Sequence, residues 1–219
     1  INITNASSNL RLQCNNISSA NSVLSFSGTK LEIDCNNISN QGAGITYAGS
    51  SAESYINFNR CVMSGTSTTT LLFNHSQGTL RFTGNYYEQA FARSGGNPMT
   101  TTMSSTARLT IDLKEFNAVS GGFSGIFTTT GKGVSISNML KKGGSAFQMG
   151  NDASNIVDFY NCQIKSTSDI FEHAFIGTIN CFNCYFYIET SRLVTLQGEA
   201  TFNLVDCIVN QPQTNSIII

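Results

Sequence analysis

A short pattern of apolar and polar positions recurs along the chain. Its eight positions read apolar, polar, apolar, two turn residues, a core residue, a spacer and a final apolar residue, as in Leu10 to Ile17 and again in Leu31 to Ile38. The alternation at positions one to three has a period of two, which is typical of a half-buried strand. The next inward positions are six and eight, so the alternation changes phase and predicts a bend between two short strands.

The pattern occurs nine times. The copies begin at Leu10, Leu31, Ile56, Leu80, Leu109, Val134, Val157, Ile179 and Phe202. Their spacing is about 24 residues, and a regular repeat of this length is typical of solenoids. In this register the third position of the third copy is Phe58, which aligns with Ile33 in the copy before and Phe82 in the copy after.

The fifth position of the pattern suits a tight bend. It holds Asn138, Asn161, Asn183, Asp206 and Gly84. These residue types tolerate the left-handed backbone conformation that such a bend requires. A third short strand follows the copies a few residues later, as at Val23 to Phe26.

Together these features predict an all-β protein: a single right-handed parallel β-helix, or solenoid, of about nine coils with three short strands per coil. Equivalent residues of successive coils are expected to stack about 4.8 Å apart. The β-helix is expected to form one domain over residues 1–219. Because the chain starts at Ile1 and not at a Met, we expect it to be a fragment of a longer chain.

The cysteines fall in columns of this repeat. Cys61, Cys162, Cys184 and Cys207 share the sixth position, and Cys14 and Cys35 lie one position earlier. Free cysteine is among the most buried residue types, so we expect an internal column of reduced thiols. Cys181 and Cys184 form a single C-x-x-C motif with no second copy, so a zinc or redox site is not favoured. No metal ion and no cofactor is predicted.

Composition narrows the range of partners. Charged residues make up 11% of the chain, against roughly 25% in an average soluble domain. The net charge of −1 gives no electrostatic reason to expect nucleic acid or an anionic membrane as a partner. No stretch approaches the ~20 apolar residues that cross a bilayer, so membrane insertion is not expected.

The Asn-rich bend and the stacked apolar and Cys columns, as in Val157 to Ile164, resemble those of the right-handed β-helix superfamily of pectate lyases, phage tailspikes and related viral appendages. The resemblance implies extended glycans, such as host-surface polysaccharide, as the ligand class. For tailspikes it also implies a homotrimer and a location on the virion surface or outside the cell. It is a resemblance of architecture, because the chain has no cluster of calcium-binding aspartates with an arginine base.

One pair of carboxylates is a candidate for catalysis. Glu88 and Glu115 are expected on one face, one coil and two residues apart, at about 8 Å. That separation suits glycoside hydrolysis by two carboxyl groups. Tyr86, which would stack beside Glu115, and Asn117 are the candidate ligand-binding residues. Two Glu on neighbouring coils are also compatible with a solvated surface.

Three functions remain open. The favoured one is a structural or receptor- and glycan-binding appendage, a spike or fibre of a virus or phage, that associates with copies of itself. The second is a polysaccharide depolymerase of the tailspike type, a hydrolase or a lyase, and the third is a bacterial surface adhesin. Low charge and few acidic clusters favour a binding protein over an enzyme, and His75 and His173 have no triad partner at a recognisable spacing.

Overall fold

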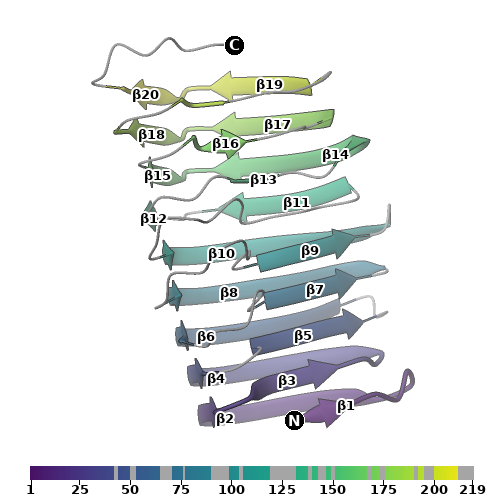
Figure 1. Cartoon of the computed structure of the whole chain (residues 1–219). Helices are drawn as coiled ribbons and strands as arrows, with labels where there is room; N and C mark the ends of the chain where they lie inside the picture. The colour runs from purple at the N-terminus through teal and green to yellow at the C-terminus, as the bar shows by residue number, and fades with distance from the viewer. Residues whose placement is uncertain are drawn as a thin grey trace.

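The computed structural model describes residues 1–41, 44–49, 53–64, 71–75, 77–89, 99–103, 106–118, 132–137, 140–142, 147–148, 151–166, 169–172, 176–189, 192–194 and 200–211. These residues form β-strands and connections, and none of them lies in a helix. Most strands belong to two parallel sheets, which Figure 1 shows as a stack that rises from the N-terminus to the C-terminus. The fold is therefore an all-β parallel solenoid.

The larger sheet has 13 strands. Its first part is a ladder of five long strands: β2 (Asn9–Ser19), β4 (Lys30–Asn40), β6 (Glu53–Met63), β8 (Gly78–Gln89) and β10 (Ala107–Ala118). Its second part consists of shorter strands in pairs: β11 (Lys132–Ser137) and β12 (Leu140–Lys142), β14 (Asn151–Tyr160) and β15 (Gln163–Ser166), β17 (Ile176–Phe182) and β18 (Tyr185–Ile188), and β19 (Ala200–Val205) and β20 (Ile208–Asn210). Strand β10 joins the two parts, because it pairs with both β11 and β12.

The smaller sheet faces the first part of this ladder. It contains β1 (Asn2–Ile3), β3 (Ser22–Phe26), β5 (Gly44–Gly49), β7 (Leu71–His75) and β9 (Met99–Met103). A further short pair is formed by β13 (Phe147–Gln148) and β16 (Phe171–Glu172). Strands of the two sheets alternate along the chain, which defines about five turns of solenoid from β1 to β10. The predicted nine coils, three strands per coil and right-handed sense go beyond this description and stay predictions.

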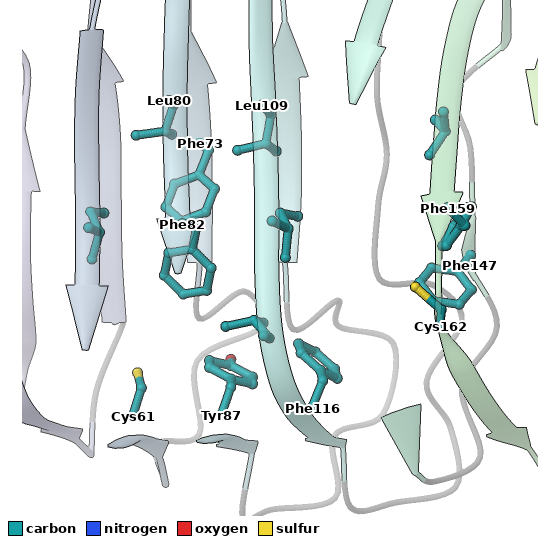
Figure 2. Packing of buried hydrophobic residues seen from close by; sticks show 14 of the residues in the cluster. Cys61, Phe73, Leu80, Phe82, Tyr87, Leu109, Phe116, Phe147, Phe159 and Cys162 are labelled. Atoms are coloured by element: carbon teal, nitrogen blue, oxygen red, sulfur yellow. The ribbon is translucent and has the colours of Figure 1, made fainter. Parts of the chain in front are cut away.

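The core lies between the sheets, where inward side chains of successive strands stack. The rings of Tyr87 and Phe116 stack at 4.8 Å between centroids, and Phe73 of the smaller sheet meets Phe82 of the larger one at 5.3 Å. Figure 2 shows these rings, with the thiol of Cys61 next to Tyr87. Stacked aromatic rings contribute beyond the area that they bury, which favours the parallel register of their strands.

The register of the third copy differs from the sequence prediction. Ile33 of β4 pairs with Ile56 of β6, and Ile56 pairs with Phe82 of β8. Phe58 pairs instead with Cys35 and Gly84, so its predicted alignment with Ile33 and Phe82 is wrong by two residues. A slip of two residues keeps every inward side chain inward, because side chains in a strand alternate with a period of two.

The corner between the two halves of each pattern has two forms. In the long strands the fifth position points inward and the sixth points outward. Cys35 (2% exposed) occupies the fifth position, and so does Phe58 (3%) in the register of the structure. In the split strands the sixth position points inward, as at Cys162 and Cys184. The prediction of an inward sixth position is therefore correct at Cys61, Cys162 and Cys184. It is wrong in the first, second, fourth and fifth copies, where Asn15, Asn36, Asn85 and Lys114 are exposed, and Met139 lies outside the described residues.

Asparagine and aspartate build the later corners. Asn161, Asn183 and Asp206 have φ angles of 54°, 52° and 53°, which confirms the predicted left-handed conformation. The amide of Asn183 donates a 2.8 Å hydrogen bond to Asn161 Oδ1 and links two corners along the stack. Gly84 does not have positive φ, so that part of the prediction is wrong, and Asn138 lies outside the described residues.

Candidate functional site

An open groove of about 700 Å³ runs along the outside of the five long strands. It is lined by Gln13, Cys14, Asn15, Asp34, Cys35, Asn36, Asn57, Phe58, Asn59, Thr83, Gly84, Asn85, Asp112 and Lys114. These residues are the fourth, fifth and sixth positions of successive copies. The groove spans five neighbouring strands, a length of about 19 Å at 4.8 Å per step.

Side chains on both rims form hydrogen-bonded ladders. On the fourth-position rim, Asn57 donates to Asp34 Oδ1 at 3.0 Å, and Thr83 donates to Asn57 Oδ1 at 3.0 Å. On the sixth-position rim, Asn85 donates to Asn59 Oδ1 at 2.7 Å. The parallel register holds these polar groups at a regular spacing along the groove.

Each ladder leaves hydrogen-bonding capacity for a ligand. A side-chain amide has two N–H donors and an oxygen with two lone pairs. In Asn57, Asp34 takes one N–H donor and Thr83 takes one oxygen lone pair, so the ladder itself does not use the second N–H or the second lone pair.

The predicted carboxylate pair lies beyond the groove, past the corner. Glu115 of β10 pairs with Tyr86 of β8, and Asn117 pairs with Glu88. The four predicted site residues are therefore neighbours on one outer face of two adjacent strands. Each of them is half-buried.

Contacts within this cluster hold the Glu88 carboxylate in place. The Tyr86 hydroxyl donates a 2.7 Å hydrogen bond to Glu88 Oε2, and a guanidinium nitrogen of Arg60 lies 3.9 Å from the same oxygen. The Arg60 guanidinium also lies 5.6 Å from the centre of the Tyr86 ring. The bond to Glu88 raises the pKa of the Tyr86 phenol, because deprotonation would place two negative charges side by side.

The Glu88 carboxylate is engaged by Tyr86 and Arg60. A glycosidase needs one protonated carboxyl group that is positioned to donate to the leaving oxygen. Glu88 Oε2 instead accepts a hydrogen bond from Tyr86 and faces the cation of Arg60. Tyr86 offers an aromatic ring flanked by polar groups, which is the composition of a sugar platform.

The same outer face also carries a cleft that is lined by aromatic residues. Tyr185 of β18 continues the column of Glu115 through the pairings of β12, β15 and β18. A cleft of about 250 Å³ is lined here by Gln163, Ile164, Lys165, Tyr185 and Tyr187. The Lys165 ammonium lies 5.3 Å from the centre of the Tyr187 ring and 2.6 Å from Glu189 Oε1.

Sequence reasoning missed the groove and Arg60. In the register of the structure, the fourth and sixth positions are polar in the first five copies, but the repeat predicts an inward sixth position. The two-residue slip at Phe58 also placed Val62 where the structure has Arg60, which pairs with Tyr86. Continuous columns of outward polar residues, sought in alternative registers of the repeat, are the signal that predicts both the groove and the place of Arg60.

The remaining candidate groups are buried. His75 Nδ1 lies 3.1 Å from the Tyr47 hydroxyl, which donates a 3.0 Å hydrogen bond to Ser54 Oγ. All three side chains are inaccessible to solvent, so they do not form an active site, and His173 lies outside the described residues. Within the described part of the chain, no three His, Cys, Asp or Glu side chains are placed to hold a metal ion.

All seven cysteines are free thiols. Cys162 and Cys184 are buried at the neighbouring corners that follow β14 and β17, and Cys207 is half-buried, which confirms the internal thiol column for the later copies. Cys61 lies instead in the eighth-position column, paired with Ile38 and Tyr87.

No family model, curated protein or solved structure matches this chain. Among the described residues, no helix has the length and apolar character to cross a membrane.

Proposed function

We propose that this chain is a glycan-binding β-helical shaft, in which the groove along β2 to β10 holds an extended and largely uncharged polysaccharide. The observation that carries the proposal is the groove itself, with its ladders of stacked amides and a hydroxyl. Asp34, Asp112 and Lys114 are the only ionisable residues on its rims, so most of its polar lining is neutral. Neutral hydroxyl groups are the partners that such a surface recognises without a charge to compensate.

The wider role follows from the fold and the resemblance. A stiff parallel solenoid of nine coils, with three strands per coil, would serve as the shaft of a spike or fibre on a virion or phage. Tailspikes, which the repeat resembles, associate as homotrimers and act outside the cell on host-surface polysaccharide, and we propose the same for this chain. An adhesin on a bacterial surface is the alternative with the same ligand class.

Binding to a panel of neutral and acidic capsular polysaccharides tests the groove, with retardation in affinity electrophoresis as the measurement. Replacing Asn59 and Asn85 by Ala should weaken binding of the retained polysaccharide at least tenfold. Asn203→Ala is the matched control, because Asn203 donates the same kind of ladder bond to Asn180 outside the groove. Equal binding by both variants, or no binding to any polysaccharide, would contradict the proposal.

A depolymerase is the second candidate, and the juxtaposition of Glu88 and Glu115 beside Tyr86 favours it. Incubation with a bound polysaccharide, followed by assays for new reducing ends and for unsaturated ends, distinguishes hydrolase and lyase from binding protein. Activity that is lost in Glu115→Gln would establish the enzyme. Binding without cleavage would contradict the depolymerase and support the glycan-binding shaft.

The proposed trimer has its own test. Leu204, Val205 and Ile208, near the end of the described stack, are 38%, 45% and 62% exposed. Exposed apolar groups of this kind favour association. Light scattering should give three times the chain mass of 23.6 kDa, and a monomer at high concentration would rule the trimer out.

A further inference from the structure

Cys14 and Cys35 lie side by side in the floor of the groove. They are directly paired in the register of β2 and β4, and their Sγ atoms are 3.1 Å apart. Cys35 is buried and Cys14 is half-buried, and both line the groove. A reagent of low mass can therefore reach this pair of thiols from solvent.

The backbone geometry is compatible with a disulfide. A disulfide needs Cα atoms about 4.4 to 6.8 Å apart. Directly paired residues on neighbouring strands are about 4.8 Å apart, so no large backbone movement is required. Of the other cysteines, Cys61, Cys162 and Cys184 are fully buried and do not line the groove.

We propose that Cys14 and Cys35 form a thiol–disulfide exchange site, which glutathione disulfide or a similar small disulfide oxidises to an intramolecular disulfide. The thiolate of Cys14 attacks one sulfur of glutathione disulfide, which forms a mixed disulfide and releases one glutathione thiolate. The thiolate of Cys35 then attacks the Cys14 sulfur and displaces the second glutathione. Two protein thiols are oxidised and one glutathione disulfide is reduced to two glutathione molecules, whose thiolates take up the protons.

The two cysteines have different parts in this sequence. Cys14 is the more accessible thiol and reacts first. Burial raises the pKa of Cys35 to about 11, and its thiol donates to the Asn37 carbonyl at 3.2 Å. The second step is therefore expected to accelerate as the pH rises.

The product would secure the first coil of the stack. Among the described strands, β2 has β4 as its only partner in the larger sheet. Its inward residues Leu10, Leu12 and Ile17 are only partly buried, so this coil is the least protected part of the first ladder. A cross-link between positions 14 and 35 restricts the unfolded chain and so stabilises the coil.

The test is incubation of the full chain with glutathione disulfide at pH 8, followed by alkylation in denaturant and peptide mapping. Wild type should lose two alkylatable thiols, give a Cys14–Cys35 linked peptide and melt at a higher temperature, all reversed by reductant. Cys35→Ser should stop at a glutathione adduct on Cys14, and Cys14→Ser should give neither product. Cys207→Ser is the control and should behave as wild type.

Phenylarsine oxide, which bridges adjacent thiols, gives a measurement that needs no variant. Native protein should bind one equivalent, and prior oxidation should abolish the binding. Retention of all seven thiols after oxidation, or a linked peptide that joins Cys162 and Cys184, would overturn the proposal.

Discussion

Gly84 lies beside Phe58 in the register of β6 and β8, and the Phe58 ring fills the space that a side chain at position 84 would need. A Cβ atom on Gly84 would lie 2.2 Å from Cε2 of Phe58. The ring is 3% exposed and packs against Phe82 at 5.0 Å between centroids, which limits its freedom to move away. This glycine is required for space and not for its backbone angles.

Gly84→Ala should therefore lower the free energy of unfolding by about 1–3 kcal/mol, because it overpacks the core. Urea denaturation followed by circular dichroism measures the change. Thr79→Ala, a change on the same strand at a residue outside the groove, is the control for an altered strand residue.

The pair can be tested by a double-mutant cycle. Phe58→Leu shortens the side chain that meets position 84, so Gly84→Ala should cost less in the Phe58→Leu background than in wild type. Strictly additive costs would mean that the two positions do not contact each other.

The corner asparagines give a second prediction. Asn161→Val should lower the free energy of unfolding by about 1–3 kcal/mol, because a β-branched residue is strained at a φ of 54° and loses the bond from Asn183. Asn161→Gly keeps access to positive φ and should cost less. If Asn161→Val unfolds at the wild-type denaturant midpoint, the strain argument is wrong.

His75 gives the fold a predicted pH dependence. Burial lowers the pKa of His75 in the folded protein, an effect that backbone contacts at Gly78 and Gly49 and the charge of Glu53 partly offset. The unfolded chain therefore takes up a proton near the ordinary pKa of about 6.5, while the folded chain stays neutral. Stability should be constant above that pH and should fall as the pH drops toward the lowered folded-state pKa.

Urea midpoints between pH 8 and pH 5 measure this dependence. His75→Gln keeps a hydrogen-bonding group near Tyr47 but does not titrate, so its midpoint should fall less across the same range. Parallel curves for the two proteins would assign the acid sensitivity to other groups.

Side-chain type was enough to predict part of the structure. Asn161 and Asn183 were placed correctly because few residues tolerate positive φ. The register of copies four and five was also correct, so the sequence placed Glu88 and Glu115 on one face, as the pairings have it. The predicted register of Phe58 is wrong because Ile56 and Phe58 are both apolar and two residues apart, and a slip of two preserves burial.

The groove cannot be predicted from the periodic pattern alone. The place of the corner depends on whether the fifth or the sixth position points inward. Residue type does not decide this, because a buried Cys occupies the fifth position at Cys35 and the sixth position at Cys162. Only the pairing of neighbouring strands shows that Asn57 and Asn59 lie on the two rims of one groove.

The measurement that tests the central claim most directly is the response of assigned Asn side-chain amide resonances to a bound oligosaccharide. The resonances of Asn36, Asn57, Asn59 and Asn85 should shift in a saturable way, since these amides line the groove. Those of Asn180 and Asn203, which form a ladder elsewhere, should stay in place. Saturable shifts confined to the second ladder, or none at all with any polysaccharide of the panel, would contradict the proposed glycan groove.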